Sequence, residues 1–515
     1  QQIVELGLDP NGIQGRNFIY LVNEILGFPR YLSQHTGGFI ISEGPLYELV
    51  PVENAAMEER TVIQWDKDDL ATLGLLKVDV LALGMLSMIR RCFGLIAQHE
   101  NHHHCIANIT RQQDDANVYQ AIQKADTIGV FQIESRAQMQ MLPRLKPRTY
   151  YDLVIQIAIV RPGPIQGDMV HPYLKRRDGI EPISYPSEAV KAVLERTLGV
   201  PIFQEQVIKL AMVAAGFSGG EADQLRRAMA KWQRNGKLYP FKEKLLNGMS
   251  ERGYSAEFAE RIFKQICGFG EYGFPESHSA SFAVLAYVSA WLKYYYPSVF
   301  YCALLNSYPM GFYSPAQLVQ DATRHAVTIY DVDINASNYD LTLESIKTID
   351  SKQQSFALRL GLRQIKGLSR QAADTVIAQR PTAGYQKLSD IKGLGYEQHT
   401  ITQKDLNALA SSGALHSFGD NRYALRWLMM DDLYDLPLFR PLAPSVHDKV
   451  QQPAYITRPD DQDNLIEDYQ TLGLSLQHHP IALLQRHNQL GRFTQVQHLI
   501  NIPHQKPVTL IGVVT

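Results

Sequence analysis

In the pattern of apolar and polar positions, a short stretch at residues 75–81, LLKVDVL, is rich in apolar and β-branched residues. This composition predicts a short buried strand. Because side chains alternate between the faces of a strand, Lys77 and Asp79 share one face about 6–7 Å apart, and Val78 and Val80 share the other. Burying a charged pair on a strand that is expected to be shielded from water costs free energy unless other interactions compensate for it. The pair is either a structural ion pair, or a metal-binding carboxylate beside a lysine that faces phosphate.

The rest of the pattern is mainly helical. Residues 1–34 predict helix, and a glycine-permitted turn at 34–38 leads into a second strand. Further helices are expected at 203–215, from 218 onward and at 282–305, and a strand is expected at 326–334.

The helix that begins after Ser218 carries two adjacent arginines. The sequence SGGE, from Ser218 to Glu221, fits a capping box. Arg226 and Arg227 point away from its apolar side, which is formed by Ala222, Leu225, Met229 and Trp232. Two such arginines on a packed helix suit a triphosphate, although a solvent-exposed pair is the plain alternative.

Basic residues gather in two runs, at 136–178 and 224–246. Because they flank apolar-periodic helices in one region, they favour a polyanionic partner over two merely solvated faces. The rigid turn RPGP fixes Arg161 at the end of an apolar run. A glycine-punctuated loop with Tyr272 and His278 precedes the helix at 282–305, a place where binding residues often lie.

Two glycine-containing segments between short helices resemble helix-hairpin-helix motifs. The first is residues 361–369, followed by a helix at 370–379, and the second is residues 405–428. Such hairpins offer backbone N–H groups to DNA phosphates. Lys366, Gly367, Ser369 and Arg370 are the candidate DNA-binding residues of the first.

After Met430 an acidic segment, DDLYDLPLF, contains Pro437 and a few apolar residues. Such a segment is either a docking peptide for a partner's groove or a linker that folds back on its own domain. The polar segment 446–505 follows as a helical connector, and residues 507–515 predict a strand. The run NHHHC at 101–105 is expected to be a surface loop rather than a metal site, because adjacent residues converge poorly on one ion.

The chain has 515 residues, 45% of them hydrophobic and 20% charged, and a formal net charge of −2. This length predicts three or more domains, and no apolar run is long enough to span a membrane. The four cysteines form no C-x-x-C pair, as in reduced cytoplasmic proteins. The chain begins at Gln1 without methionine and ends within an apolar run, so we expect a piece of a longer protein.

Taken together, these motifs resemble those of the bacterial family C DNA polymerases, the alpha subunit of polymerase III, and most closely the error-prone branch. The motifs that carry the resemblance are HTGGFIIS (35–42), GLLKVDVLALGML (74–86), GVFQIESR (129–136), RPGP (161–164), FQEQV (203–207), LRRAMAKW (225–232) and YGFPESHSASFA (272–283). The last of these, with NSYPMGFYSPAQLVQDA (306–322) and DVDINAS (331–337), favours the error-prone branch, because the replicative branch usually carries Asn-Lys in place of Pro275-Glu276.

The resemblance implies a role for each candidate residue. Asp79 would be the third metal-binding aspartate of the palm, and Lys77 the palm lysine near primer and phosphate. The incoming nucleotide would be bound by Arg226, Arg227, Tyr272, His278 and Arg161. The sliding-clamp motif would comprise Asp435, Leu436, Leu438 and Phe439, with Asp435 where glutamine is preferred, which weakens binding.

The implied fold is multidomain, α/β and mainly α. Its expected parts are the end of a thumb (1–34), the carboxy-terminal part of a mixed-sheet palm (35–90), helical fingers (91–345), tandem helix-hairpin-helix motifs (346–430), the clamp peptide with its connector (431–505) and the first strand of an OB domain (506–515).

The implied function is DNA-directed DNA synthesis by a cytoplasmic enzyme in damage-induced (SOS) mutagenesis and translesion synthesis. It needs two Mg²⁺ ions, primer-template DNA, deoxynucleoside triphosphates, the beta sliding clamp and accessory mutagenesis proteins. The family's other two catalytic aspartates would precede Gln1, so this piece alone is expected to be inactive. The alternatives are a replicative alpha subunit and a non-catalytic module that binds DNA and the clamp.

Overall fold

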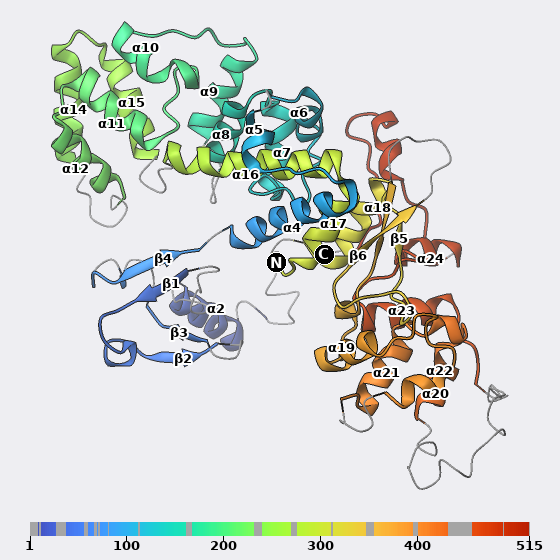
Figure 1. Ribbon diagram of the computed structural model, residues 1–515. Helices are drawn as coiled ribbons and strands as arrows, with labels where there is room; N and C mark the ends of the chain where they lie inside the picture. Colours follow the sequence, from blue (N-terminus) through green and yellow to red (C-terminus); the bar gives the residue numbers. More distant parts are fainter. Residues whose placement is uncertain are drawn as a thin grey trace, which may run out of the picture. The chain divides into compact units, whose positions relative to one another are not determined.

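The computed structural model describes residues 9, 12–26, 38–55, 60–65, 69–70, 73–80, 82–111, 114–160, 167–230, 239–268, 275–310, 313–346, 355–394, 400–430, 456–487 and 489–513. The chain forms two compact units, Gln1–Leu83 and Gly84–Thr515 (Figure 1). In the described residues, no helix is both long and apolar enough for a membrane span.

The first unit contains one helix and two small antiparallel sheets. The helix is α2 (Ile13–Ile25), and the strands are β1 (Gly38–Ile41), β2 (Val52–Asn54), β3 (Thr61–Ile63) and β4 (Leu76–Asp79). Strand β4 pairs with β1, so that Lys77 lies opposite Ile40 and Asp79 opposite Gly38. Strand β2 pairs with β3. The predicted strand at 75–81 is therefore confirmed in its centre.

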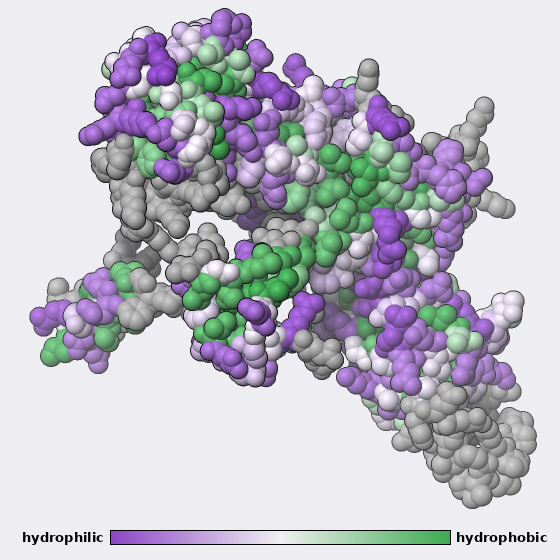
Figure 2. Space-filling model, turned by 60° about the vertical axis from the view of Figure 1, so that its left-hand side comes forward, coloured by the Kyte–Doolittle hydropathy of each residue, from purple (hydrophilic) through white to green (hydrophobic). Residues whose placement is uncertain are grey.

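The expectation that this strand is buried is wrong for the unit as it stands. The β1–β4 sheet has two strands, and Leu76 is 58% exposed. Within the described part of the first unit, no third strand continues this sheet, and Phe39 and Ile41 of β1 are each 50% exposed. Figure 2 shows one face of the molecule, where both hydrophilic and apolar areas reach the surface.

The second unit begins with a large helical region built around α16 (Glu276–Tyr295). Helix α16 packs against α8 (Tyr150–Ile159), α5 (Ile106–Arg111), α6 (Ala116–Gln123) and α17 (Pro297–Asn306), as Figure 1 shows. The other helices of this region are α4 (Leu83–Glu100), α7 (Arg136–Leu145), α9 (Gly167–Arg177), α10 (Glu188–Leu194), α11 (Gln204–Ala215), α12 (Gly219–Ala230), α14 (Tyr239–Glu251), α15 (Ala256–Gly268) and α18 (Pro315–Arg324).

Helix α8 illustrates why this region folds as it does. Thr149 and Asp152 form a capping box at its start, which satisfies backbone donors that a helix leaves free. Every residue from Leu153 to Ile159 is buried, so the helix is covered on all sides. It is therefore a central element of the core.

The single helix expected at 282–305 is two helices, because Pro297 interrupts it. Proline lacks a backbone N–H group and disfavours helical geometry in the residue before it. Tyr296 accordingly leaves the helical region, with φ −133° and ψ 57°, and α17 begins at Pro297. Trp291 and Phe300 are buried, whereas Tyr294 and Tyr295 are exposed.

The remaining part of the second unit has a three-stranded sheet and further helices. The strands lie in the order β5 (Ile329–Tyr330), β7 (Ser355–Arg359), β6 (Thr342–Ile346), with β5 parallel and β6 antiparallel to β7. The helical elements are η3 (Leu362–Gln364), α19 (Arg370–Ala378), α20 (Leu388–Lys392), α21 (Gln403–Ser411), α22 (Arg422–Met430), α23 (Asp461–Thr471), α24 (Pro480–Arg486) and η6 (Val496–Asn501).

The strand predicted at 507–515 is not formed in residues 507–513. A strand needs a ladder of backbone hydrogen bonds to a neighbour. Here one bond is present, from the N–H of Thr494 to the carbonyl of Thr509 at 2.8 Å. Val508, Leu510 and Val513 are exposed.

A buried charge network connects α16 with two distant segments. The side chain of Lys293 is 3% exposed, and its Nζ lies 2.8 Å from both Asp126 Oδ1 and Asp321 Oδ2. Tyr301 donates a hydrogen bond to Asp321 Oδ2, and His325 Nε2 lies 2.7 Å from Asp126 Oδ2. Burial alone would raise the pKa of Asp126, but the hydrogen bond from His325 and the ammonium of Lys293 outweigh it and lower this pKa to about 2.

Replacing Lys293 by methionine should destabilise the second unit by about 3–5 kcal/mol, because it leaves two carboxylates without their shared cation. Denaturant titration of wild type and Lys293→Met measures the loss. Lys191→Met is the control, since Lys191 makes an exposed pair with Glu188 and should change little. An equal effect of both substitutions would contradict the role given to the network.

Candidate nucleotide and DNA sites

The candidate metal-binding position lies on β4. Asp79 is the last residue of the strand, and its partner across the sheet is Gly38, which has no side chain. Lys77 is two positions earlier, so strand geometry assigns both residues to one face. The side chain of Asp79 is outside the described residues, and its role stays a prediction.

The helix that carries the two candidate arginines forms as expected. The capping box is confirmed, since the N–H and hydroxyl of Ser218 donate to Glu221 Oε2, at 3.0 and 2.9 Å. Ala222 and Leu225 are buried, and α12 packs on α11. Arg226 and Arg227 lie on α12. Their side chains, like those of Met229 and Trp232, are outside the described residues.

The structure brings two of the sequence motifs together at the start of α16. The backbone N–H of Glu276 donates to the carboxylate of Glu205, at 3.0 Å. Glu276 Oε1 in turn accepts the hydroxyl of Tyr151, at 2.8 Å, and lies 3.6 Å from Arg196 Nη1. The FQEQV motif therefore fixes the first turn of the helix that follows the YGFPES motif.

His278 lies two residues further along this helix. It is exposed at the surface, and its ring is 4.1 Å from that of Phe282. Partial burial lowers the pKa of His278 below its usual value of 6.5. The imidazole is therefore neutral at pH 7, which suits hydrogen bonding or stacking better than pairing with a phosphate charge. Tyr272 and Arg161 lie outside the described residues.

The first hairpin has the expected helix–hairpin–helix geometry, formed by η3, a turn and α19. Gly367 occupies the turn with φ +86°, a backbone conformation that favours glycine. Ser369 caps α19 by accepting the N–H of Ala372, at 3.1 Å. Arg370 begins the helix, is 63% exposed, and lies 3.8 Å above the ring of Tyr339.

Three donors of this hairpin are already bonded within the chain. The backbone N–H of Lys366 donates to the carbonyl of Thr471, at 2.8 Å, and its Nζ donates to the carbonyl of Tyr469, at 3.1 Å. The N–H of Ser369 donates to the buried carboxylate of Asp405, at 2.8 Å. The end of α23 and the start of α21 therefore take up donors that the sequence assigned to DNA phosphate.

In the described residues, one group of acidic and histidine side chains converges closely enough to bind a metal: Asp126, Asp321 and His325. A metal ion is not favoured there. The ammonium of Lys293 lies 2.8 Å from both carboxylates, where a cation would sit. The pKa of His325 is raised, chiefly by its hydrogen bond with Asp126, so its contribution to stability is complete at acidic pH and declines as the pH rises through this pKa.

The run at 101–105 is a loop, as predicted. His104 Nε2 lies 3.2 Å from the hydroxyl of Tyr296, and its ring packs against Trp291. These aromatic contacts account for His104 without a metal. The candidate clamp residues, Asp435, Leu436, Leu438 and Phe439, lie outside the described residues.

Comparison with known proteins matches a family model to each of three parts of the chain. The model of the bacterial DNA polymerase III alpha subunit finger domain matches residues 85–253. The model of the bacterial DNA polymerase III alpha NTPase domain matches residues 4–82, and a helix-hairpin-helix model matches residues 326–425. Residues 4–82 and 85–253 are thus similar to two domains of the bacterial DNA polymerase III alpha family.

Within this family, the chain is similar to proteins named error-prone DNA polymerase. It is 63% identical to the one from Vibrio parahaemolyticus over 515 residues, covering 100% of this chain and 49% of that protein. It is 54% identical to the one from Idiomarina loihiensis, covering 98% of this chain and 47% of that protein. The chain thus spans about half the length of the curated relatives it matches.

Sequence reasoning missed the partners that position these residues. The predictions above include neither the ion pairs of Lys293 nor the contacts of Glu205, Asp405 and Thr471. A lysine among apolar residues is a usable signal of a buried ion pair. The other contacts join segments far apart in the sequence, and nothing in one sequence announces them.

Changing Gly367 to alanine should lower the stability of the hairpin module by about 1–2 kcal/mol, because a side chain at positive φ is strained. The nearest atom to an added Cβ is Lys404 Cε at 3.7 Å, so crowding adds little. Thermal unfolding of Gly367→Ala measures the cost. Gly220→Ala is the matched control, since Gly220 is helical with open space around it. Equal stability of the two variants would contradict the turn assignment.

Proposed function

We propose that the protein to which this chain belongs is an error-prone DNA polymerase, which adds deoxynucleotides to a primer 3′ end. The observation that supports this most is identity of 51–63% to proteins of that name along nearly all of the chain. A helix-hairpin-helix module in the same chain is consistent with a DNA substrate. Damage-induced mutagenesis, translesion synthesis and a cytoplasmic location belong to the same proposal.

The proposed chemistry centres on Asp79. A carboxylate is a ligand that Mg²⁺ prefers, and Gly38 opposite leaves its face of the sheet open at that position. Bound metal would activate the primer hydroxyl and neutralise the leaving pyrophosphate. Asp79 would hold the ion, and Lys77 on the same face would approach the phosphates of primer or nucleotide.

The nucleotide would be bound by residues of the helical region. Arg226 and Arg227 suit the triphosphate because guanidinium groups form paired hydrogen bonds with phosphate oxygens. Tyr272 and the neutral imidazole of His278 suit the base and sugar, and Arg161 adds a further positive charge. The proposed DNA-binding residues of the first hairpin are Lys366, Gly367, Ser369 and Arg370, all of them exposed.

Further parts of the proposal are finer than the family itself. Residues 35–90 would form part of the palm, residues 506–515 would begin an OB domain, and Asp435, Leu436, Leu438 and Phe439 would bind the beta sliding clamp. Accessory mutagenesis proteins would act with it.

Two other functions have a specific test. A replicative alpha subunit would extend an undamaged primer-template and stop at an abasic site, whereas an error-prone enzyme would pass it. A non-catalytic module would bind DNA and the clamp without extending any primer. Primer extension by the full-length protein on both templates separates the three.

In the full-length protein, Asp79→Ala should lower the rate of primer extension by at least about a thousandfold, since one metal ligand supports several kcal/mol of transition-state stabilisation. Single-turnover extension measures it. Glu53→Ala, at another position of the same unit, serves as the control. Extension by Asp79→Ala at the wild-type rate would remove the catalytic assignment.

Arg226→Ala should raise the KM for the incoming nucleotide roughly 10- to 100-fold, as expected for loss of a charged hydrogen bond to phosphate. The Kd for primer-template DNA should change much less. Steady-state kinetics and DNA-binding titration give the two constants, with Lys191→Ala as the control. Equal changes in both constants would instead put this arginine on the duplex.

Changing Leu438 and Phe439 together to alanine should weaken capture by the beta sliding clamp roughly tenfold or more, because apolar anchors supply most of the energy of such peptides. A pull-down with immobilised clamp tests it, with primer extension in the absence of clamp as the control. Undiminished capture would remove the clamp assignment.

A further inference from the structure

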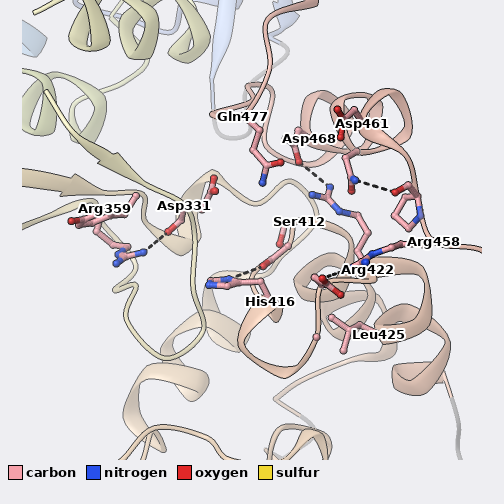
Figure 3. Close-up of a pocket in the computed structure, with 16 residues that line it drawn as sticks. Asp331, Arg359, Ser412, His416, Arg422, Leu425, Arg458, Asp461, Asp468 and Gln477 are labelled. Carbon is pink, nitrogen blue, oxygen red and sulfur yellow. Dashed lines mark hydrogen bonds and ion pairs between the residues drawn. The ribbon is translucent and has the colours of Figure 1, made fainter. Parts of the chain in front are cut away.

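A pocket of about 630 Å³ lies in the second unit, between the three-stranded sheet, the segment from the end of α21 into α22, and α23 (Figure 3). Its volume is in the range of small-molecule sites. The residues that line it come from several segments: Tyr330, Asp331, Arg359, Ser412, His416, Asp420, Arg422, Leu425, Arg458, Asp461, Asp468 and Gln477 are among them.

All three arginines of the pocket already have carboxylate partners. Arg359 donates two hydrogen bonds to Glu344, at 2.7 and 3.1 Å. Arg422 Nη1 lies 2.9 Å from Asp468 Oδ1, and Arg458 pairs with Asp420. Each arginine that lines the pocket is therefore already paired, and none is left over to bind an anion.

The aspartates on the far wall are also paired. Asp468 accepts the hydroxyl of Ser475, at 2.7 Å, in addition to its pair with Arg422. Asp461 lies 3.3 Å from His478 Nε2 and 3.2 Å from Arg486 Nη1. Asp461 and Asp468 therefore already have partners within the chain.

Asp331 differs from them. In the described part of the chain its carboxylate has neither a hydrogen-bond donor nor a cation within 4 Å. Arg359 bonds to its backbone carbonyl instead, at 3.0 Å, and His416 turns to Asp333, at 3.6 Å. Figure 3 shows the Asp331 side chain projecting into the pocket on the side of Gln477, across from Arg422 and Asp468.

Asp331 is half-buried, and its side chain faces the pocket. Burial, and then the negative charge of Asp468, raise the pKa of Asp331 above its usual value. The nearby guanidinium groups of Arg359 and Arg422 reduce this effect without bonding to the carboxylate. A group with N–H donors and a positive charge would satisfy it.

The rest of the lining narrows the ligand to an organic cation. Tyr330, Leu425 and Pro459 supply apolar surface that fits an aliphatic chain. A directly ligated metal ion is disfavoured, because the only convergent three-ligand group in the described residues lies elsewhere, at Asp126, Asp321 and His325. We propose that this pocket binds a primary ammonium group carried on an aliphatic chain, with Asp331 as its carboxylate partner.

Such an ammonium could belong to a free diamine or to a lysine side chain of a partner. The probes are 1,5-diaminopentane and Nα-acetyl-lysine methylamide, titrated into the full chain by calorimetry. Both should bind. Tighter binding of the diamine identifies a free polyamine as the source, and equal or tighter binding of the lysine derivative identifies a partner's lysine. No binding of either probe overturns the proposal.

Asp331→Asn should weaken binding of the better probe roughly 10- to 100-fold, as for loss of a charged hydrogen bond. Asp178→Asn, at an exposed aspartate outside the pocket, should leave it unchanged. Magnesium chloride at matched ionic strength should not displace the probe. Unchanged affinity in Asp331→Asn, or displacement by magnesium, would show diffuse attraction and overturn the proposal.

A second measurement does not depend on the ligand. Because Asp331 has no partner, Asp331→Asn should keep or raise the thermal midpoint of the chain, whereas Asp468→Asn should lower it by removing the partner of Arg422. A midpoint that falls as far in Asp331→Asn as in Asp468→Asn would make Asp331 a structural residue and overturn its assignment as a ligand-binding group.

Discussion

The ammonium group of Lys293 is the constraint on which the helical region depends. A buried cation must keep its partners, and here the partners come from the segment before the GVFQIESR motif and from α18. The hydroxyl of Ser289, on the same helix α16, accepts a hydrogen bond from the backbone N–H of Phe131, at 3.2 Å. The position of that motif is therefore fixed from α16, both by charge and by hydrogen bonding.

Helix α16 also connects this core to the proposed nucleotide site. Its last turn carries the buried Lys293, and its first turn carries Glu276, held by Glu205 and Tyr151. His278 stands on that turn, so it is placed by a rigid element. A substitution at Lys293 would thus disturb residues proposed to bind nucleotide without touching them, which matters when kinetic effects in this region are interpreted.

Much of the fold could be predicted from the sequence, because local signals were strong. The capping box at Ser218, the helix at 204–215, the hairpin around Gly367 and the strand around Lys77 all follow from residues close in sequence. The prediction of one long helix at 282–305 was wrong because it followed the apolar pattern and took no account of Pro297. The strand predicted at 507–515 does not form in residues 507–513, because a β-branched composition does not by itself provide a neighbouring strand to pair with.

The site was less predictable for a physical reason. The residue types that suit phosphate and metal could be named from their chemistry and from the family resemblance. The partners that their donors bind within the chain could not be predicted, because Lys366 contacts Thr471 and Ser369 contacts Asp405 only in the folded protein. The unpaired carboxylate of Asp331 is likewise invisible in the sequence, where it is one acidic residue among 52.

The central claim is that the carboxylate of Asp79 binds a metal ion beside the phosphates of an incoming nucleotide. Its most direct test is a structure of the full-length protein with primer-template, nucleotide and Mn²⁺, whose anomalous scattering locates the ion. The account predicts an Asp79 oxygen about 2.0–2.2 Å from a Mn²⁺ that also contacts the triphosphate. An Asp79 carboxylate turned away from that ion, or sealed in a core, would contradict it.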